Sequence, residues 1–214
     1  SALVAVAAAS IEPAAALGGI ISGPGFVYLA YLPLAHIMEL VCELMMLMQG
    51  CALGYGGTGT LLPTSPKMLQ TKPPQKGDAQ ALRPHLVLAA PAVLDKILVA
   101  VKGKIGAKGK LVQKLFKCAF DSGDARFDAG KVGAGGCLGL LMKPIQKLLG
   151  GRLRIFCTGS APLAVGTQKF VQTVFSCPVR QGYGLTETCA AVQLITDQTV
   201  TPSSGRRRSA RPQH

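Results

Sequence analysis

The sequence predicts an α/β fold in which mostly parallel β-strands are layered with helices. From Phe26 onward, short β-type runs alternate with segments of helical period, and the strand-like runs are apolar throughout, as strands buried on both faces are. In addition, 49% of the residues are hydrophobic and only 15% are charged. A chain of 214 residues with this composition has room for one core of ordinary size, or for part of a larger unit.

The first predicted elements follow residue 25. Residues 26–32 form a strand-like run, and Ile37–Met48 repeats apolar residues with the period of a helix. Glu39 and Glu43 lie one turn apart on that helix. We interpret them as a solvated polar stripe rather than as ligands of a metal ion. A second strand is expected over residues 51–55.

The middle of the chain alternates in the same way. A Pro- and Gly-rich loop over residues 56–77 precedes a third strand at 86–90, which opens into a helical region. From Lys96 to Lys117 there are seven lysines and no acidic residue, and the apolar residues between them predict a basic amphipathic helix that three glycines interrupt. We interpret it as a surface helix with solvated lysines. Contact with an anionic membrane surface is the alternative.

The rest of the chain completes the alternation and ends in a basic tail. We expect a small-residue loop, a helix, a strand, a second helix and a last strand, over residues 121–136, 137–149, 152–158, 165–175 and 177–181. We assign the domain proper to residues 26–200. The Ala- and Gly-rich leading segment, 1–25, is expected to be a helical remnant of the same domain. Residues 201–214 have no hydrophobic period and are expected to be disordered.

The net charge of +13 points to an anionic partner. The chain has no Trp and only 5% aromatic residues, so nucleic acid is not expected, because single-strand binding sites stack bases on aromatic side chains. The seven cysteines show no zinc-ligand spacing, and the start of the chain lacks the basic region of a signal peptide. We expect an intracellular protein, cytoplasmic or peripheral on an endomembrane, and not a secreted one.

The segment Gln181–Thr188 (QGYGLTET) concentrates residues suited to a nucleotide. Its glycines allow a ligand to approach the backbone, and Tyr183 offers a flat face to a purine. Thr186 can bond a phosphate oxygen, and Glu187 supplies a hard oxygen for Mg²⁺. An ordinary strand-to-helix turn capped by Thr186 explains the same residues equally well.

This octapeptide resembles the aromatic-Gly-x-Thr-Glu motif of the adenylate-forming (AMP-binding) superfamily, in the form used by long-chain acyl-CoA synthetases. Other segments resemble that family in the same order along the chain: Tyr28–Leu40, Thr64–Lys67, Lys76–Asp78, and Arg152–Arg154 leading to Gly159–Leu163. The resemblance covers residues 28–189. It implies that the α/β fold is a partial adenylate-forming N-terminal domain.

The resemblance also implies roles for individual residues. Tyr183 would lie against adenine, Thr186 on the phosphates and Glu187 on Mg²⁺, with Thr186 and Glu187 as the catalytic pair. His36 would lie near the acyl carboxylate, although a satisfied core histidine is the alternative. The residues assigned to ATP or AMP are Gly159, Ser160, Ala161, Pro162, Gln181, Gly182, Tyr183, Gly184 and Thr186.

The implied activity is that of a long-chain fatty acid–CoA ligase. A fatty carboxylate attacks the α-phosphate of ATP to give an acyl-adenylate, and coenzyme A then displaces AMP, while Mg²⁺ offsets charge on the phosphates. The family's phosphate loop, ribose-binding Asp, hinge and C-terminal lysine are not in this sequence, and it leaves the family pattern near Val192. We therefore expect a fragment that is inactive alone. The alternatives are a non-catalytic nucleotide- or membrane-binding module and an incomplete gene model.

Overall fold

The computed structural model describes residues 23–68, 75–188 and 193–195. The predicted leading segment, apart from its last three residues, and the predicted basic tail lie outside these ranges. The helices and strands, in chain order, are β1 (Val27–Ala30), α3 (Ile37–Met48), β2 (Ala52–Tyr55), α4 (Asp78–Leu82), β3 (Leu86–Leu88), α5 (Pro91–Gly106), α6 (Lys110–Asp128), α7 (Leu138–Gln146), η1 (Lys147–Leu149), β4 (Ile155–Thr158), α8 (Val165–Phe175), β5 (Val179–Tyr183), η2 (Thr186–Thr188) and β6 (Gln193–Ile195).

The strands form one sheet in the order β2-β1-β3-β4-β5-β6. Strands β1 to β5 pair in parallel, and β6 joins the edge of β5 in the antiparallel direction. The mostly parallel sheet expected from the sequence is therefore confirmed. Because five strands point the same way, the loops that follow them emerge at one edge of the sheet, where open α/β sheets bind their ligands.

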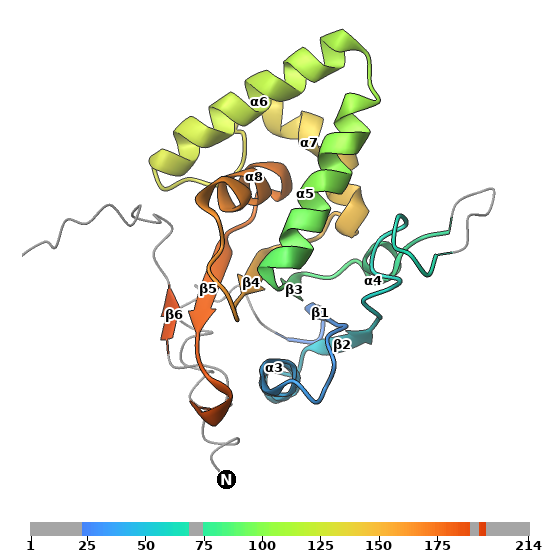
Figure 1. Cartoon of the computed structure of the whole chain (residues 1–214), viewed down its shortest axis with the longest axis vertical. Helices are drawn as coiled ribbons and strands as arrows, with labels where there is room; N and C mark the ends of the chain where they lie inside the picture. The colour runs from blue at the N-terminus through green and yellow to red at the C-terminus, as the bar shows by residue number, and fades with distance from the viewer. Residues whose placement is uncertain (1–22, 69–74, 189–192, 196–214) are drawn as a thin grey trace, which may run out of the picture.

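The two faces of the sheet are covered unequally. Helices α5, α6, α7 and α8 lie on one side of it and α3 lies on the other (Figure 1). Successive strand residues enter different cores: Leu29 belongs to the large cluster under α5 to α8, whereas Tyr28 and Ala30 belong to the smaller cluster under α3. This alternation explains why the strand sequences are apolar on both faces.

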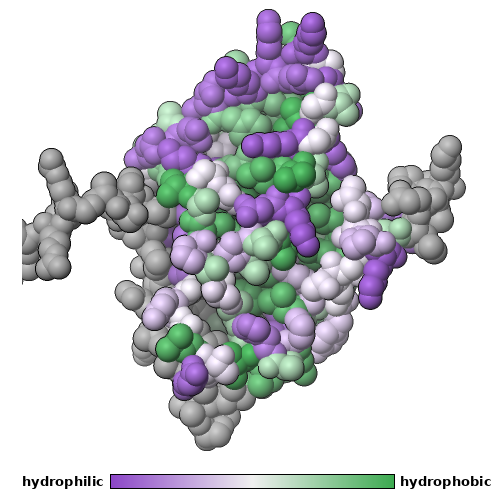
Figure 2. Space-filling model, viewed as in Figure 1, coloured by the Kyte–Doolittle hydropathy of each residue, from purple (hydrophilic) through white to green (hydrophobic). Residues whose placement is uncertain are grey.

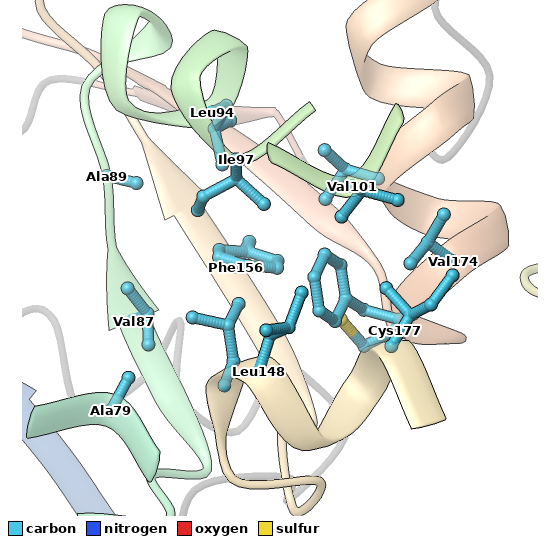
Figure 3. Close-up of a cluster of buried hydrophobic side chains, with 14 of the residues drawn as sticks. Ala79, Val87, Ala89, Leu94, Ile97, Val101, Leu148, Phe156, Val174 and Cys177 are labelled. Atoms are coloured by element: carbon cyan, nitrogen blue, oxygen red, sulfur yellow. The ribbon is translucent and has the colours of Figure 1, made fainter. Parts of the chain in front are cut away.

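The larger core is centred on β4. Phe156 is fully buried and points from β4 toward Ile97 of α5 and Leu148, as Figure 3 shows. Phe175 at the end of α8 packs edge-on against it, with ring centroids 5.6 Å apart. Burial of such side chains contributes about 1.5–3 kcal/mol each to the free energy of unfolding. This packing holds β4, and the loop that follows it, in place.

Two helices have the bounds that hydrophobic periodicity predicted, α3 and α8. The expected single basic helix over 96–117 is instead two helices, because the chain turns at residues 107–109 between α5 and α6. The prediction of a loop over residues 121–136 is wrong for the first eight of them, which belong to α6. Gly123, one of the small residues of this segment, lies where α6 packs against α8. A Cβ at this position would overlap the side chain of Thr173. Short elements α4 and β6 were not predicted.

None of the helices in the described part of the chain combines the length and apolar composition that crossing a membrane requires.

Candidate functional site

The two loops singled out by the sequence lie side by side at the carboxyl edge of the sheet. Gly159–Pro162 follows β4, and Gln181–Tyr183 forms the end of β5. The strands are paired so that Thr158 lies opposite Gln181. Sheet pairing therefore brings together two segments that are about twenty residues apart in the sequence.

Gly159 is the point of closest approach at this edge. It is buried, and a Cβ added there would lie 3.2 Å from the carbonyl oxygen of Gly182 and 3.2 Å from the sulfur of Met38. Met38 is in the first turn of α3, so this helix also reaches the edge. Ser160 follows with a φ of 70°, a left-handed conformation that turns the loop sharply. Three segments that carry the family resemblance therefore meet around Gly159, where a side chain would have little space.

Beyond β5 the chain is open to solvent. Tyr183 is 62% exposed, and its ring can serve as a flat surface for a planar ligand. Thr186 begins the short helix η2, and the side chains of Thr186 and Glu187 are both exposed. Gln181 differs, because its amide donates to Gln168 on α8 at 3.3 Å. Its side chain therefore connects β5 to α8 rather than facing the loop.

Among the residues that the structure describes, Glu187 is not part of a cluster of metal-binding side chains. Within residues 23–68, 75–188 and 193–195, no group of three His, Cys, Asp or Glu side chains is placed to hold a metal ion. Mg²⁺ in nucleotide sites takes one or two carboxylates and completes its shell with water and phosphate oxygens. An exposed Glu187 fits that chemistry only together with a bound nucleotide.

His36 caps the amino end of α3. Its Nδ1 accepts a hydrogen bond from the backbone N–H of Met38 at 3.3 Å, and its side chain is exposed. The alternative of a core histidine is therefore wrong. Since the sulfur of Met38 faces Gly159, His36 lies two residues from the point where α3 approaches the β4 and β5 loops.

Two further acidic residues were misjudged from the sequence. Glu39 is fully buried and Glu43 nearly so, which contradicts the prediction of a solvated stripe. The physical reason is that tyrosines on the neighbouring strands supply hydroxyl groups to them. The hydroxyl of Tyr28 donates to Glu39 at 2.7 Å, and that of Tyr55 donates to Glu43 at 3.2 Å. The signal was present in the sequence as tyrosines at strand positions otherwise occupied by aliphatic residues.

The buried carboxyl of Glu39 titrates near neutrality. Burial raises the pKa of Glu39 to about 7, the hydrogen bond from Tyr28 opposes the rise, and the nearby Glu43 adds to it. Its Oε1 has no hydrogen-bond partner among the described residues. Glu39 can therefore gain or lose a proton close to physiological pH, one residue after Met38.

Comparison with known proteins assigns the chain to a family. The model of a family described as AMP-binding enzyme matches residues 2–211. The chain belongs to the AMP-binding enzyme family. Two curated relatives of this AMP-binding chain are similar over most of its length. Long chain acyl-CoA synthetase 8 of Arabidopsis thaliana is 41% identical over 168 residues, which cover 76% of this chain and 23% of that protein.

The second relative is Long-chain-fatty-acid--CoA ligase 2 of Schizosaccharomyces pombe. It is 36% identical over 170 residues, covering 79% of this chain and 24% of that protein. The AMP-binding chain therefore spans about a quarter of the length of these relatives. Among solved structures, the complex of VinN with L-aspartate superposes with a TM-score of 0.51 at 12% identity, over 88% of this chain and 33% of that one. That agreement concerns the fold alone, and it confirms the expected α/β class.

Proposed function

We propose that this chain supplies the nucleotide side of the active site of a long-chain fatty acid–CoA ligase. Two observations support the proposal. Relatives named as long-chain acyl-CoA synthetases or ligases are up to 41% identical to it, and the segments bearing the family motifs meet at the carboxyl edge of the sheet. The substrates would be a long-chain fatty acid, ATP and coenzyme A.

In this proposal the β4 and β5 loops hold the nucleotide. Tyr183 presents its ring to adenine, and the loop from Gly159 to Pro162 lines the adenine pocket beside it. The Thr186 hydroxyl donates to a phosphate oxygen. Glu187 binds Mg²⁺, which would neutralise charge on the phosphates as the α-phosphate is attacked. The observation that carries the proposal is the pairing of β4 with β5, which sets Thr158 opposite Gln181 and brings the two motif segments together.

The acyl carboxylate would lie on the α3 side of the same edge. His36 is exposed at the start of α3 and close in sequence to Met38, whose sulfur would lie 3.2 Å from a Cβ added at Gly159. An imidazole at that point can orient a carboxylate toward the α-phosphate by hydrogen bonding. After adenylation, the coenzyme A thiol would displace AMP and form the acyl thioester.

A chimera tests this function. Residues 26–195 of this chain replace the matching stretch of the Arabidopsis long chain acyl-CoA synthetase 8, and palmitoyl-CoA formation from ATP, palmitate and coenzyme A is measured. We expect an active chimera in which Glu187→Ala lowers kcat/KM about a hundredfold or more. Asp121→Ala, which removes an exposed carboxylate of α6, is the matched control and should leave the rate unchanged. Equal rates for the Glu187→Ala and control chimeras would refute the role of Glu187.

Contact with an anionic membrane surface is a second candidate function, favoured by one observation. Leu111 of α6 is 73% exposed beside Lys110 and Lys114, and Leu115 is also exposed. Apolar side chains among lysines suit an anionic lipid surface. Co-sedimentation with phosphatidylserine vesicles, but not with phosphatidylcholine vesicles, is expected for the chain and should be lost in Leu111→Ser. Equal sedimentation with both lipids would refute this candidate.

A further inference from the structure

A hollow lies away from the carboxyl edge, among the helices that cover the larger core. It is open to solvent, has a volume of about 410 Å³ and is lined by residues of α5, α6 and α8. Its wall includes Lys102, Ile105, Phe120, Gly166, Lys169 and Phe170. None of these residues belongs to the candidate nucleotide site. In Figure 2 hydrophilic residues line the outer edge of this region and hydrophobic ones lie between the helices.

The floor of the hollow is aromatic. Phe120 of α6 and Phe170 of α8 stack with ring centroids 5.0 Å apart and an interplanar angle of 17°. Both rings are only partly buried, although they pack against the core. Such a floor gains free energy when an apolar group covers it, since exposed apolar area is removed from water.

The rim of the hollow carries two lysines, Lys102 and Lys169, and one aspartate, Asp124. The Nζ of Lys169 is paired with Asp128 at 2.7 Å, which neutralises much of its charge. Lys102 forms no ion pair with any described residue, and its Nζ lies 5.9 Å from the centre of the Phe170 ring. Asp124 also lines the hollow and would oppose an anion. However, seven lysines and no acidic residue lie between Lys96 and Lys117, so the field on the Lys102 side of the hollow favours an anion.

The hollow is also held open by the turn between α5 and α6. The side-chain amide of Gln113 donates to the carbonyl oxygens of Gly106 at 3.0 Å and Lys108 at 2.7 Å. These bonds fix the end of α5 against the start of α6. A site with preformed walls needs less ordering when a ligand binds.

We propose that this hollow binds a small amphiphile with one carboxylate. Its apolar stem lies on Phe120 and Phe170, and its carboxylate pairs with Lys102. The volume falls within the range of about 300–1,000 Å³ that small-molecule sites occupy. The site is separate from the nucleotide edge, so this proposal and the proposed ligase function can be refuted independently of each other.

Isothermal titration of the 214-residue chain with octanoate, below its micelle concentration, tests the proposal. Octan-1-ol and octyltrimethylammonium carry the same stem without the carboxylate and are the ligand controls. We expect octanoate to bind at least tenfold more tightly than either. No heat of binding with octanoate, or tighter binding of the cation at Asp124, would overturn the proposal.

Two pairs of variants test whether the ligand binds in this hollow, and the first pair changes the space available in it. A side chain at Gly166 meets no atom within 4 Å at its Cβ, so Gly166→Leu should fill the hollow without disturbing α8. Gly103 of α5 is equally open but does not line the hollow, which makes Gly103→Leu its control. We expect Gly166→Leu to weaken octanoate binding at least tenfold and Gly103→Leu to change it less than twofold. Equal affinity in Gly166→Leu and Gly103→Leu would refute binding in this hollow.

The charge is tested in the same way, with Lys102→Gln against Lys104→Gln, an exposed lysine outside the hollow. We expect about a tenfold loss of octanoate affinity for the first variant and less than twofold for the second.

A parallel measurement with phosphatidylserine vesicles distinguishes a free carboxylate from a lipid headgroup. If vesicles bind, octanoate does not, and both lysine variants weaken vesicle binding equally, the region is a charged surface and the proposed site is absent.

Discussion

The hydroxyl of Tyr28 on β1 donates a 2.7 Å hydrogen bond to the carboxyl group of Glu39 on α3, and both side chains are completely buried. The bond connects the helix to the sheet through a titratable group. Because burial dominates, it raises the pKa of Glu39 to about 7 despite the hydrogen bond, which acts in the opposite direction. The stability of the α3 side of the fold should therefore depend on pH near neutrality.

Replacing Glu39 by Gln should flatten that dependence. The pKa of Glu39 is raised in the folded protein from its usual value of 4.5, so the folded state binds the proton more tightly. The resulting stabilisation is complete at acidic pH and is lost as the pH rises through about 7. Between about pH 5 and pH 8, wild type should lose on the order of 1–3 kcal/mol more than Glu39→Gln. Urea unfolding across this range measures the difference.

The exposed Asp121→Asn is the control for this experiment, and it should behave as wild type. A second variant, Tyr28→Phe, removes the bond that lowers the pKa of Glu39, so it should steepen the loss of stability at high pH. Parallel pH profiles for wild type and Glu39→Gln would contradict the buried titration.

Protonation of His85 should lower the stability of the fold at acidic pH. Its Nδ1 accepts a hydrogen bond from the backbone N–H of Val27 at 3.0 Å, which requires a neutral ring nitrogen. Burial, followed by the charges of Arg152 and Arg154, lowers the pKa of His85 below its usual 6.5. Stability is therefore present above about pH 6.5 and is lost as the pH falls through the lower folded-state pKa.

In His85→Asn the amide oxygen can accept the same bond without titrating. We expect this variant to lose less stability than wild type when the pH falls from about 7 to about 5, as measured by thermal unfolding. An equal or larger loss in the variant would show that other groups govern the acid transition.

Gly123 should tolerate no side chain, although it lies inside a helix. A Cβ there would overlap the side chain of Thr173, so Gly123→Ala forces α6 away from α8. We expect a loss of about 1–3 kcal/mol in the free energy of unfolding. Gly103→Ala is the matched control, because its Cβ would meet nothing within 4 Å. It should stabilise by up to about 1 kcal/mol. Similar values for the two variants would contradict the close contact between α6 and α8.

Periodicity predicted where two helices begin and end, although polar residues such as Glu39 of α3 and Gln168 of α8 are buried as well. The bounds of α3 and α8 follow from apolar residues repeating every three to four positions. It failed at Gly123, where a small residue suggested a loop but lies at a tight helix contact. It also failed at Glu39, because only the three-dimensional pairing with Tyr28 makes burial of a carboxyl group tolerable.

The candidate site was predictable as a set of motifs but not as a geometry. Residue types and family resemblance identified Gly159–Pro162 and Gln181–Thr188. They could not show that the side chain of Gln181 turns to α8, or that His36 caps a helix with its Nδ1. The hollow among α5, α6 and α8 left no motif, because its wall comes from three separate helices. The roles of Tyr183, Thr186 and Glu187 stay predictions.

The most direct test of the nucleotide site is the change in Tm of the 214-residue chain on adding millimolar Mg-ATP. The account predicts a rise of Tm in wild type that Tyr183→Ala abolishes and that omission of Mg²⁺ or Glu187→Ala reduces. Tyr55→Ala is the control, since Tyr55 is likewise exposed at the carboxyl end of a strand but lies at the opposite side of the sheet, on β2. It should retain the full rise. An unchanged Tm in wild type, or an equal rise in Tyr183→Ala and wild type, would contradict nucleotide binding by the β4 and β5 loops.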